Sequence, residues 1–260
     1  MLKTRNTSFK TVIVYSIIVI VHLLPLQVAG QEEFNKIKIN NDLELIQLNE
    51  SFFIHVSWTN SEKFGRFSSN GAVVIKNGKA LIIDTPMEEA LTTVLYNYLH
   101  DSMKVEIEKF IAGHYHDDCM GGINVLHAKN VRSIALDLTK QKCIEQNLPL
   151  PQQIFSDSLT FSFYGETVKC IYAGPGHTID NISVYFPDSK ILFGGCLLKS
   201  MSSKGLGNTA DAVVNEWDKS VEKLMILCGN AKIVIPGHGN FGNIDLLSHT
   251  IKLVKESRGK

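Results

Sequence analysis

One recurring pattern constrains the fold more than any other feature. An apolar, β-rich run ends in glycine or in proline-glycine, and a histidine or cysteine follows at once. His114 and His116 follow "FIAG", His177 follows "KCIYAGPG", Cys196 follows "KILFGG" and His238 follows "KIVIPG". Functional side chains gather at strand ends, where loops converge while the sheet holds them rigid. The chain is therefore expected to bring the ends of several strands together at one place.

The remaining composition is that of a globular protein. The 260 residues are 44% hydrophobic and 20% charged, which allows a sizeable core and argues against disorder. The sequence has no basic stripe and no interleaved basic and aromatic pattern, so nucleic acid is not an expected partner.

The first thirty residues differ from the rest. Three basic residues and no acidic one precede the apolar run "TVIVYSIIVIVHLLPLQVAG", which ends in small residues. The pattern predicts a secretory signal peptide over residues 1–30, Gln31 as the new N-terminus and a periplasmic location without stable membrane association. A retained transmembrane anchor is the alternative, because the run is near the lower length limit for a span.

Alternating apolar residues and turn signals predict the elements of the mature chain. "SFFIHVSW" is a strand, and "GAVVIKNGKALIIDT" is a hairpin around Asn77-Gly78. Apolar residues share one face in "MEEALTTVLYNYLHDSM", "VVNEWDKSVEKLMILCG" and "FGNIDLLSHTIKLVKESRGK", which predicts helices. Strands, helix, strand and helix occur twice in succession. This order predicts an α+β, four-layer αββα sandwich, with residues 31–260 forming a single domain.

The histidine cluster and the other strand ends together supply a metal-type side-chain set. The candidate ligands are His114, His116, Asp118, His177, Cys196 and His238. Six ligands suit two zinc ions, each with three protein ligands and one open position, as in catalytic zinc sites. Imidazole, carboxylate and thiolate favour zinc over magnesium or calcium, which prefer oxygen ligands.

Two readings of "HYHDD" follow from its spacing. His114, His116 and Asp118 alternate, so a locally extended chain would point them the same way. Alternatively, Asp118 opens a helix near Met120 and the histidines are bystanders. Four further histidines have no polar cluster around them and are read as structural: His55, His100, His127 and His249.

The five cysteines do not resemble a disulfide framework. Their spacings are wide and irregular, and an odd number leaves at least one unpaired. Cys196 is predicted to be a zinc ligand and not a disulfide partner, because it follows its strand as the histidines follow theirs.

The motifs around these residues resemble those of a known family. In order and spacing, "HYHDD", "GPGHTIDN", "GGCLLKS", "GNTADA" and "PGHG" are similar to motifs of the class B metallo-β-lactamases, in particular the dizinc subclass with a cysteine in its second zinc site. The likeness extends from Phe52 to the C-terminus. The resemblance implies a zinc-dependent hydrolase that opens the β-lactam ring of penicillins, cephalosporins and carbapenems and so confers antibiotic resistance.

The resemblance also implies a role for each candidate site residue. The first zinc takes His114, His116 and His177, and the second takes Asp118, Cys196 and His238. A zinc-bound hydroxide, oriented by Asp118, would attack the β-lactam carbonyl. Lys199 would bind the substrate carboxylate and Asn208 would help at the substrate carbonyl. Without the resemblance, Lys199 reads equally well as a solvated surface lysine. A monomer is expected, because no apolar surface helix stands out.

One departure from the family pattern and two rival interpretations bear on this prediction. Many members carry arginine directly after the zinc-binding aspartate, where this chain has Cys119. Thioester hydrolases of the glyoxalase type typically carry histidine at that position and a bridging aspartate in place of Cys196. A non-catalytic zinc protein would need closed coordination and would leave Lys199 and Asn208 unexplained.

The segment "TNSEKFGRFSSN" is polar and contains glycine, with Phe64 as its apolar residue. It predicts a mobile loop over residues 59–69. The resemblance implies that this loop closes over substrate.

Overall fold

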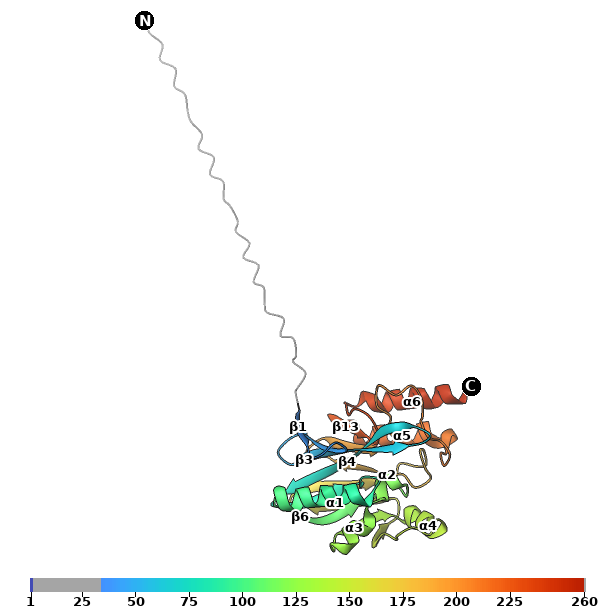
Figure 1. The fold of residues 1–260 in the computed structure, drawn as a ribbon. Coiled ribbons are helices and arrows are strands. Elements are labelled where there is room, and N and C mark those ends of the chain that lie inside the picture. The colour runs from blue at the N-terminus through green and yellow to red at the C-terminus, as the bar shows by residue number, and fades with distance from the viewer. Residues whose placement is uncertain (2–33, 260) are drawn as a thin grey trace. The chain divides into compact units, whose positions relative to one another are not determined.

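The structure is a computed structural model that describes Met1 and residues 34–259 (Figure 1). The predicted signal peptide over residues 1–30 and the predicted domain start at Gln31 lie outside the described residues. From Phe34 onwards the chain forms one compact unit. Within the described part, no helix combines the length and apolar character needed to cross a membrane.

Two sheets form the centre of this unit. The first sheet has eight strands in chain order: β1 (Asn35–Lys38), β2 (Leu43–Gln47), β3 (Phe52–Ser61), β4 (Gly65–Lys76), β5 (Lys79–Ile83), β6 (Glu106–Ile111), β7 (Arg132–Leu136) and β8 (Gln153–Phe155). The second sheet has five strands in the order β13 (Ile233–Pro236), β12 (Ile191–Gly195), β11 (Ser183–Phe186), β10 (Glu166–Ile171) and β9 (Ser158–Phe163).

Alternation along the strands creates the layers. In β4, Val74 packs between the two sheets, while its neighbour Val73 faces the helices outside the first sheet. Leu81 and Ile82 of β5 divide in the same way. A strand whose two faces are both covered must be apolar on both, which explains its continuous apolar sequence.

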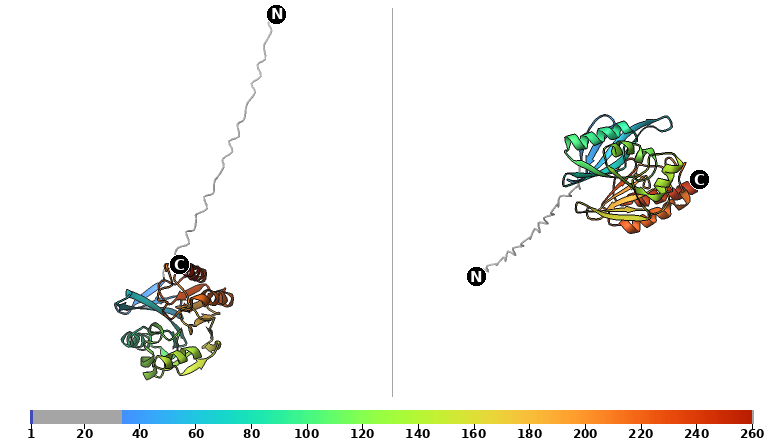
Figure 2. Two further views of the ribbon diagram at one scale, coloured as in Figure 1. Left: turned by 90° about the vertical axis from the view of Figure 1, so that its right-hand side faces the viewer. Right: turned by 90° about the horizontal axis from the view of Figure 1, so that it is seen from below.

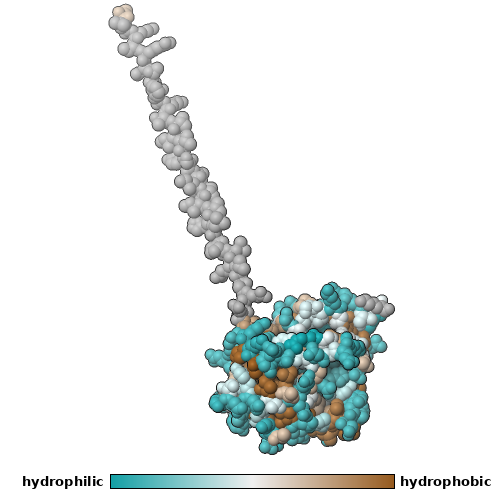
Figure 3. Space-filling view, viewed as in Figure 1, coloured by the Kyte–Doolittle hydropathy of each residue, from teal (hydrophilic) through white to brown (hydrophobic). Residues whose placement is uncertain are grey.

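Helices cover the outer face of each sheet (Figures 1 and 2). The helices beside the first sheet are α1 (Glu89–Asn97) with a π-helical turn at Tyr98–Ser102, α2 (Asp117–Met120), α3 (Ile123–Ala128) and α4 (Asp137–Glu145). Those beside the second are α5 (Val214–Cys228) and α6 (Asp245–Arg258). The face of the molecule in Figure 3 is largely hydrophilic. This arrangement confirms the predicted αββα sandwich.

The structure contradicts the prediction of a loop over residues 59–69. β3 and β4 continue as an antiparallel pair to Ser61 opposite Gly65, so only residues 62–64 connect them. Gly65 has a φ of 67°, a left-handed conformation that glycine adopts at little cost. Cross-strand hydrogen bonds pair the backbone N–H and C=O groups here, so the strands persist although their side chains are polar.

The proposed helix start at Asp118 is also wrong. Helix α2 begins at Asp117, and the residue before it, His116, makes no side-chain cap. Asp118 lies inside this first turn, so the chain is not extended from His114 to Asp118. The helical turn instead directs Asp118 to a different group of side chains from His116.

Candidate metal centre

Six predicted ligands meet at one edge of the sandwich because their strands end there. β6 ends before His114 and His116, and β12 and β13 end before Cys196 and His238. His177 follows β10 after a glycine-proline-glycine segment. The first sheet therefore contributes one part of the cluster and the second sheet the rest.

Three histidines form the first group. One ring nitrogen from each of His114, His116 and His177 lies within 4.8 Å of the others. The Nε2 atom of His114 is 3.0 Å from the Nδ1 atom of His116. His114 and His177 are buried and His116 is half-buried. The three rings meet at steep angles to one another, so their nitrogens converge on a point.

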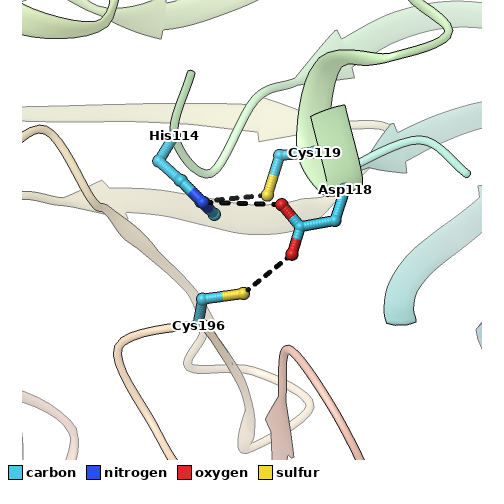
Figure 4. A group of neighbouring side chains, drawn as sticks. All are labelled: His114, Asp118, Cys119 and Cys196. Carbon is cyan, nitrogen blue, oxygen red and sulfur yellow. Dashed lines mark hydrogen bonds and ion pairs between the residues drawn. The ribbon is translucent and has the colours of Figure 1, made fainter. Parts of the chain in front are cut away.

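A second group forms around Asp118. Its Oδ2 atom is 3.1 Å from His238 Nε2 and 3.4 Å from Cys196 Sγ. Cys196 Sγ is also 3.5 Å from His238 Nε2. Figure 4 shows Asp118 between His114 and Cys196, with the sulfur of Cys119 beside the imidazole of His114.

Charges within the cluster determine which protonation states it favours. Burial alone would raise the pKa of Asp118, but the hydrogen bond with His238 and the charge of His114 hold that pKa well below its usual range. A hydrogen bond with Cys119 lowers the pKa of the Cys196 thiol and outweighs its burial. The group therefore favours a carboxylate and a thiolate side by side, which are anionic ligands for a cation.

The donor set fits a zinc ion by its chemistry and by one unpaired atom. Buried Asp118 Oδ1 has no hydrogen-bond partner among the described residues, and its distance to His114 Nε2 is 3.6 Å. Buried polar atoms normally have partners. A cation beside this oxygen would satisfy it, and imidazole, carboxylate and thiolate are the ligands that zinc prefers.

Backbone and carboxylate contacts fix the ligands from behind. His116 Nε2–H donates to Asp211 Oδ2 at 3.0 Å, and His238 Nδ1–H donates to the Ser68 carbonyl at 2.8 Å. Each bond occupies one ring nitrogen and so fixes the imidazole tautomer. The free nitrogens are those that face the other candidate ligands.

Sequence reasoning missed three supporting aspartates. Asp84 accepts a hydrogen bond from the Gly113 backbone at 2.6 Å, and Asp180 accepts one from the Tyr115 backbone at 3.0 Å. Both hold the loop that carries the histidines. Asp211 is the third. The quoted motifs contain Asp180 and Asp211, but only the folded contacts reveal what these residues do.

A cavity of about 590 Å³ opens over both groups. Lys199 lines it and is only 8% exposed, so the alternative of a solvated surface lysine is wrong. Its Nζ atom lies 5.1 Å from the centre of the Trp217 ring, and burial lowers its pKa. Asn208 is exposed at the rim, and Phe64 and Phe67 line the wall formed by the β3–β4 hairpin.

None of the four histidines predicted to be structural belongs to this cluster. His55 bonds the Asp84 carbonyl, His127 bonds Ser133 and His249 bonds the Ser203 carbonyl. His100 is exposed and pairs with its neighbour Asp101.

Known proteins with similar sequences and structures identify the family. The chain matches the family described as ODP family beta lactamase over residues 67–228. It is 39% identical over 239 residues to the type 2 metallo-beta-lactamase of Bacteroides fragilis, covering 92% of this chain and 95% of the relative. The corresponding Bacillus cereus protein is 34% identical over 218 residues, covering 82% and 83%.

A solved structure agrees with these sequence matches. The metallo-beta-lactamase from Pontibacter korlensis matches with a TM-score of 0.79 and 33% identity, covering 82% of this chain and 99% of that one. Together with the donor group that contains Cys196, these similarities show that the chain belongs to the class B metallo-β-lactamase family.

Proposed function

We propose that this protein is a zinc-dependent hydrolase that opens the β-lactam ring and that it holds two zinc ions. The convergence of six donor side chains below one cavity is the observation that carries the proposal. In the proposed assignment, His114, His116 and His177 hold the first ion. The second ion is held by Asp118, Cys196 and His238.

The chain's own residues prepare the site for hydrolysis. Zinc bound there would lower the pKa of water from about 15.7 to about 7 and so supply a nucleophile at neutral pH. Asp118, whose carboxylate lies between the two ligand groups, is proposed to orient that nucleophile as well as bind metal. The hydrogen bonds from His116 to Asp211 and from His238 to the Ser68 carbonyl support the proposed roles of these two histidines as metal ligands, because each bond leaves the other ring nitrogen free.

Lys199 and Asn208 are proposed to bind the substrate. The Lys199 ammonium lies in the cavity beside an aromatic ring, where water screens its charge poorly. A carboxylate on the substrate would therefore be attracted strongly to it. The side-chain amide of Asn208, at the rim, can donate to the carbonyl oxygen on which negative charge develops.

The proposed substrates are penicillins, cephalosporins and carbapenems, and the proposed consequence is antibiotic resistance. All three classes present a ring amide and a carboxylate, the two groups for which the cavity offers partners. The protein is further proposed to be exported to the periplasm with removal of residues 1–30 and to act there as a monomer.

A metal-depletion experiment tests the proposal. The purified protein should hydrolyse a chromogenic β-lactam, lose this activity in excess chelator and regain it when zinc is added. His116→Ala should abolish turnover, whereas the exposed His100→Ala should leave it unchanged. Turnover that persists after thorough metal removal would contradict the proposal.

A further inference from the structure

Cys119 has no role in the proposed ligand set, although its side chain reaches that set. All five cysteines are free and buried thiols. Only Cys119 and Cys196 belong to a common donor group, in which the ligand atoms lie within 4.8 Å of one another. Figure 4 shows the two sulfur atoms on either side of the Asp118 carboxylate.

The fold holds these two thiols close together. The Cys119 backbone is bonded on both sides, because its N–H donates to the His116 carbonyl and its own carbonyl accepts from Thr85. Cys196 is confined from the opposite side by Gly237, where a Cβ atom would lie 2.3 Å from the Cys196 sulfur. Segments that follow strands of both sheets therefore hold the sulfur atoms of Cys119 and Cys196 close together.

The other three cysteines belong to no donor group with Cys119 or Cys196. Cys143 packs beneath the first sheet in the hydrophobic cluster that also contains Cys119, whereas Cys170 lies between the sheets and Cys228 beneath the second. Cys143 has the sulfur of Met120 as its neighbour, at 3.9 Å. The pairing of Cys119 with Cys196 is the one for which the structure shows two sulfur atoms within 4.8 Å of each other.

We propose that Cys119 and Cys196 form a reversible disulfide when the second zinc is lost and a peroxide is present. The inference rests on the proposed function, in which zinc occupies the Cys196 sulfur. A disulfide requires a sulfur separation of about 2.05 Å, so the side chains must rotate towards each other from within 4.8 Å. The intervening Asp118 carboxylate must move aside, which becomes easier once zinc no longer holds it.

The reaction balances with hydrogen peroxide as the oxidant. The Cys196 thiolate attacks one peroxide oxygen, so that a sulfur–oxygen bond forms, the oxygen–oxygen bond breaks and hydroxide leaves. Cys119 then attacks the resulting sulfenic acid. A sulfur–sulfur bond forms, the sulfur–oxygen bond breaks, and the Cys119 proton leaves with that oxygen as water. The hydroxide takes up the proton that the Cys196 thiol lost on forming the thiolate. In sum, two thiols are oxidised by two electrons and one peroxide is reduced to two molecules of water.

The disulfide would protect the site from permanent damage. A sulfenic acid without a thiol partner proceeds to sulfinic acid, which ordinary reductants do not reverse. A disulfide returns to two thiols on reduction. While it exists, Cys196 cannot bind zinc, but His114, His116 and His177 remain available. Oxidation is therefore expected to hold a protein that has lost its second zinc in a one-zinc state until it is reduced.

Intact-mass measurement tests this inference. Metal-free protein is treated with hydrogen peroxide, denatured and alkylated. Three alkylated cysteines are expected in place of five, with a crosslinked peptide containing Cys119 and Cys196. Reduction should restore all five alkylation sites and a zinc content of two per chain. Protein that keeps its zinc should resist the same treatment.

Two variants give matched controls. Cys119→Ser should prevent the crosslink and direct Cys196 to sulfinic acid, so that reduction no longer restores the second zinc. Cys143→Ser, a substitution of another buried cysteine, should behave like the unaltered protein. Five alkylatable cysteines after peroxide treatment, or a crosslink to a different cysteine, would overturn the inference. Crosslinking at equal rates with and without zinc would support the thiol pair but contradict Cys196 as a zinc ligand.

Discussion

Gly237 illustrates how a residue without a side chain shapes the second ligand group. A Cβ atom at this position would lie 2.3 Å from Cys196 Sγ and 2.8 Å from the Cys196 backbone nitrogen. Both contacts are too short for any side chain, so the sulfur occupies the place that glycine leaves open. The position of Cys196, a proposed zinc ligand, thus depends on Gly237. This glycine directly precedes His238, another proposed ligand.

Gly237→Ala is therefore expected to displace the Cys196 sulfur and to lower zinc content from the proposed two per chain towards one. The first group, His114, His116 and His177, does not contact Gly237 and should keep its ion. Zinc is measured after dialysis against limiting free metal. Gly205→Ala is the control, because a Cβ atom there would meet nothing within 4 Å. Equal zinc content in both variants would show that the sulfur can move without loss of metal.

Lys199→Ala is expected mainly to raise KM for substrates that carry a carboxylate. A charge-assisted contact of this kind contributes roughly 1.5–3 kcal/mol, which corresponds to about a 10- to 150-fold change. Lys204→Ala, which removes an exposed lysine from the following loop, should leave KM unchanged. If both variants keep the original KM, another group binds the carboxylate.

The sequence identified the side chains that meet in the cluster more readily than the residues that support them. A metal ligand must be one of a few residue types, so four strand ends with such residues form a recognisable pattern. Asp84 acts by accepting a backbone hydrogen bond from Gly113, and any buried aspartate could do so. Its role depends on a neighbour 29 residues away, and no local spacing encodes that distance.

At the scale of elements, the β3–β4 hairpin is where sequence reasoning failed. Periodicity identifies a strand because one face is buried, but neither face is fully buried in the outer part of this hairpin. Its side chains are mostly half-buried or exposed, so polar residues occur on both faces. Cross-strand hydrogen bonds alone define these strand ends, and they leave no mark on composition. Helix α4 was missed for a related reason, since its sequence has no continuous apolar stripe.

The hairpin tip is expected to contribute to substrate binding and not to metal binding. Phe64 is 50% exposed and lines the cavity, so a bound substrate would cover apolar surface. Phe64→Ala should raise KM by roughly fivefold, from about 1 kcal/mol of lost burial. Zinc content should not change. Tyr164→Ala, at another exposed turn, is the control. Loss of zinc together with affinity would mean that the tip supports the metal groups.

At the scale of the whole molecule, the two sheets are held together by the core between them and meet again at the ligand cluster. Alternating apolar residues predicted the second sheet, most of the first sheet and the outer helices α1, α5 and α6, because a buried face leaves a clear signal. The strands β1, β2 and β7 were not predicted. Most residues of β1 are exposed, but β2 and β7 are largely buried and short, at five residues each, so burial alone does not make a strand recognisable in the sequence.

His55 gives the fold a stability that depends on pH. The side chain is 1% exposed, and its Nε2–H donates to the Asp84 carbonyl at 3.0 Å. Its Nδ1 atom is buried without a partner among the described residues. Burial lowers the pKa of His55 to about 4, although the hydrogen bond to Asp84 acts in the opposite direction. The folded protein therefore holds His55 neutral in a range where the unfolded chain binds a proton.

This difference predicts a loss of stability on acidification. Below a pH of about 6.5 the unfolded chain gains a proton at His55 that the folded protein does not, so the contribution is complete above that pH and declines towards pH 4. The decline should reach about 2 kcal/mol by pH 5. His55→Gln keeps a side-chain N–H donor but cannot titrate. Urea unfolding of both metal-free proteins from pH 8 to pH 5 measures the difference, and effects of other titrating groups, the Asp84 carboxyl included, largely cancel in the comparison. A difference in unfolding free energy that stays constant over this range would show that His55 titrates normally in the folded protein.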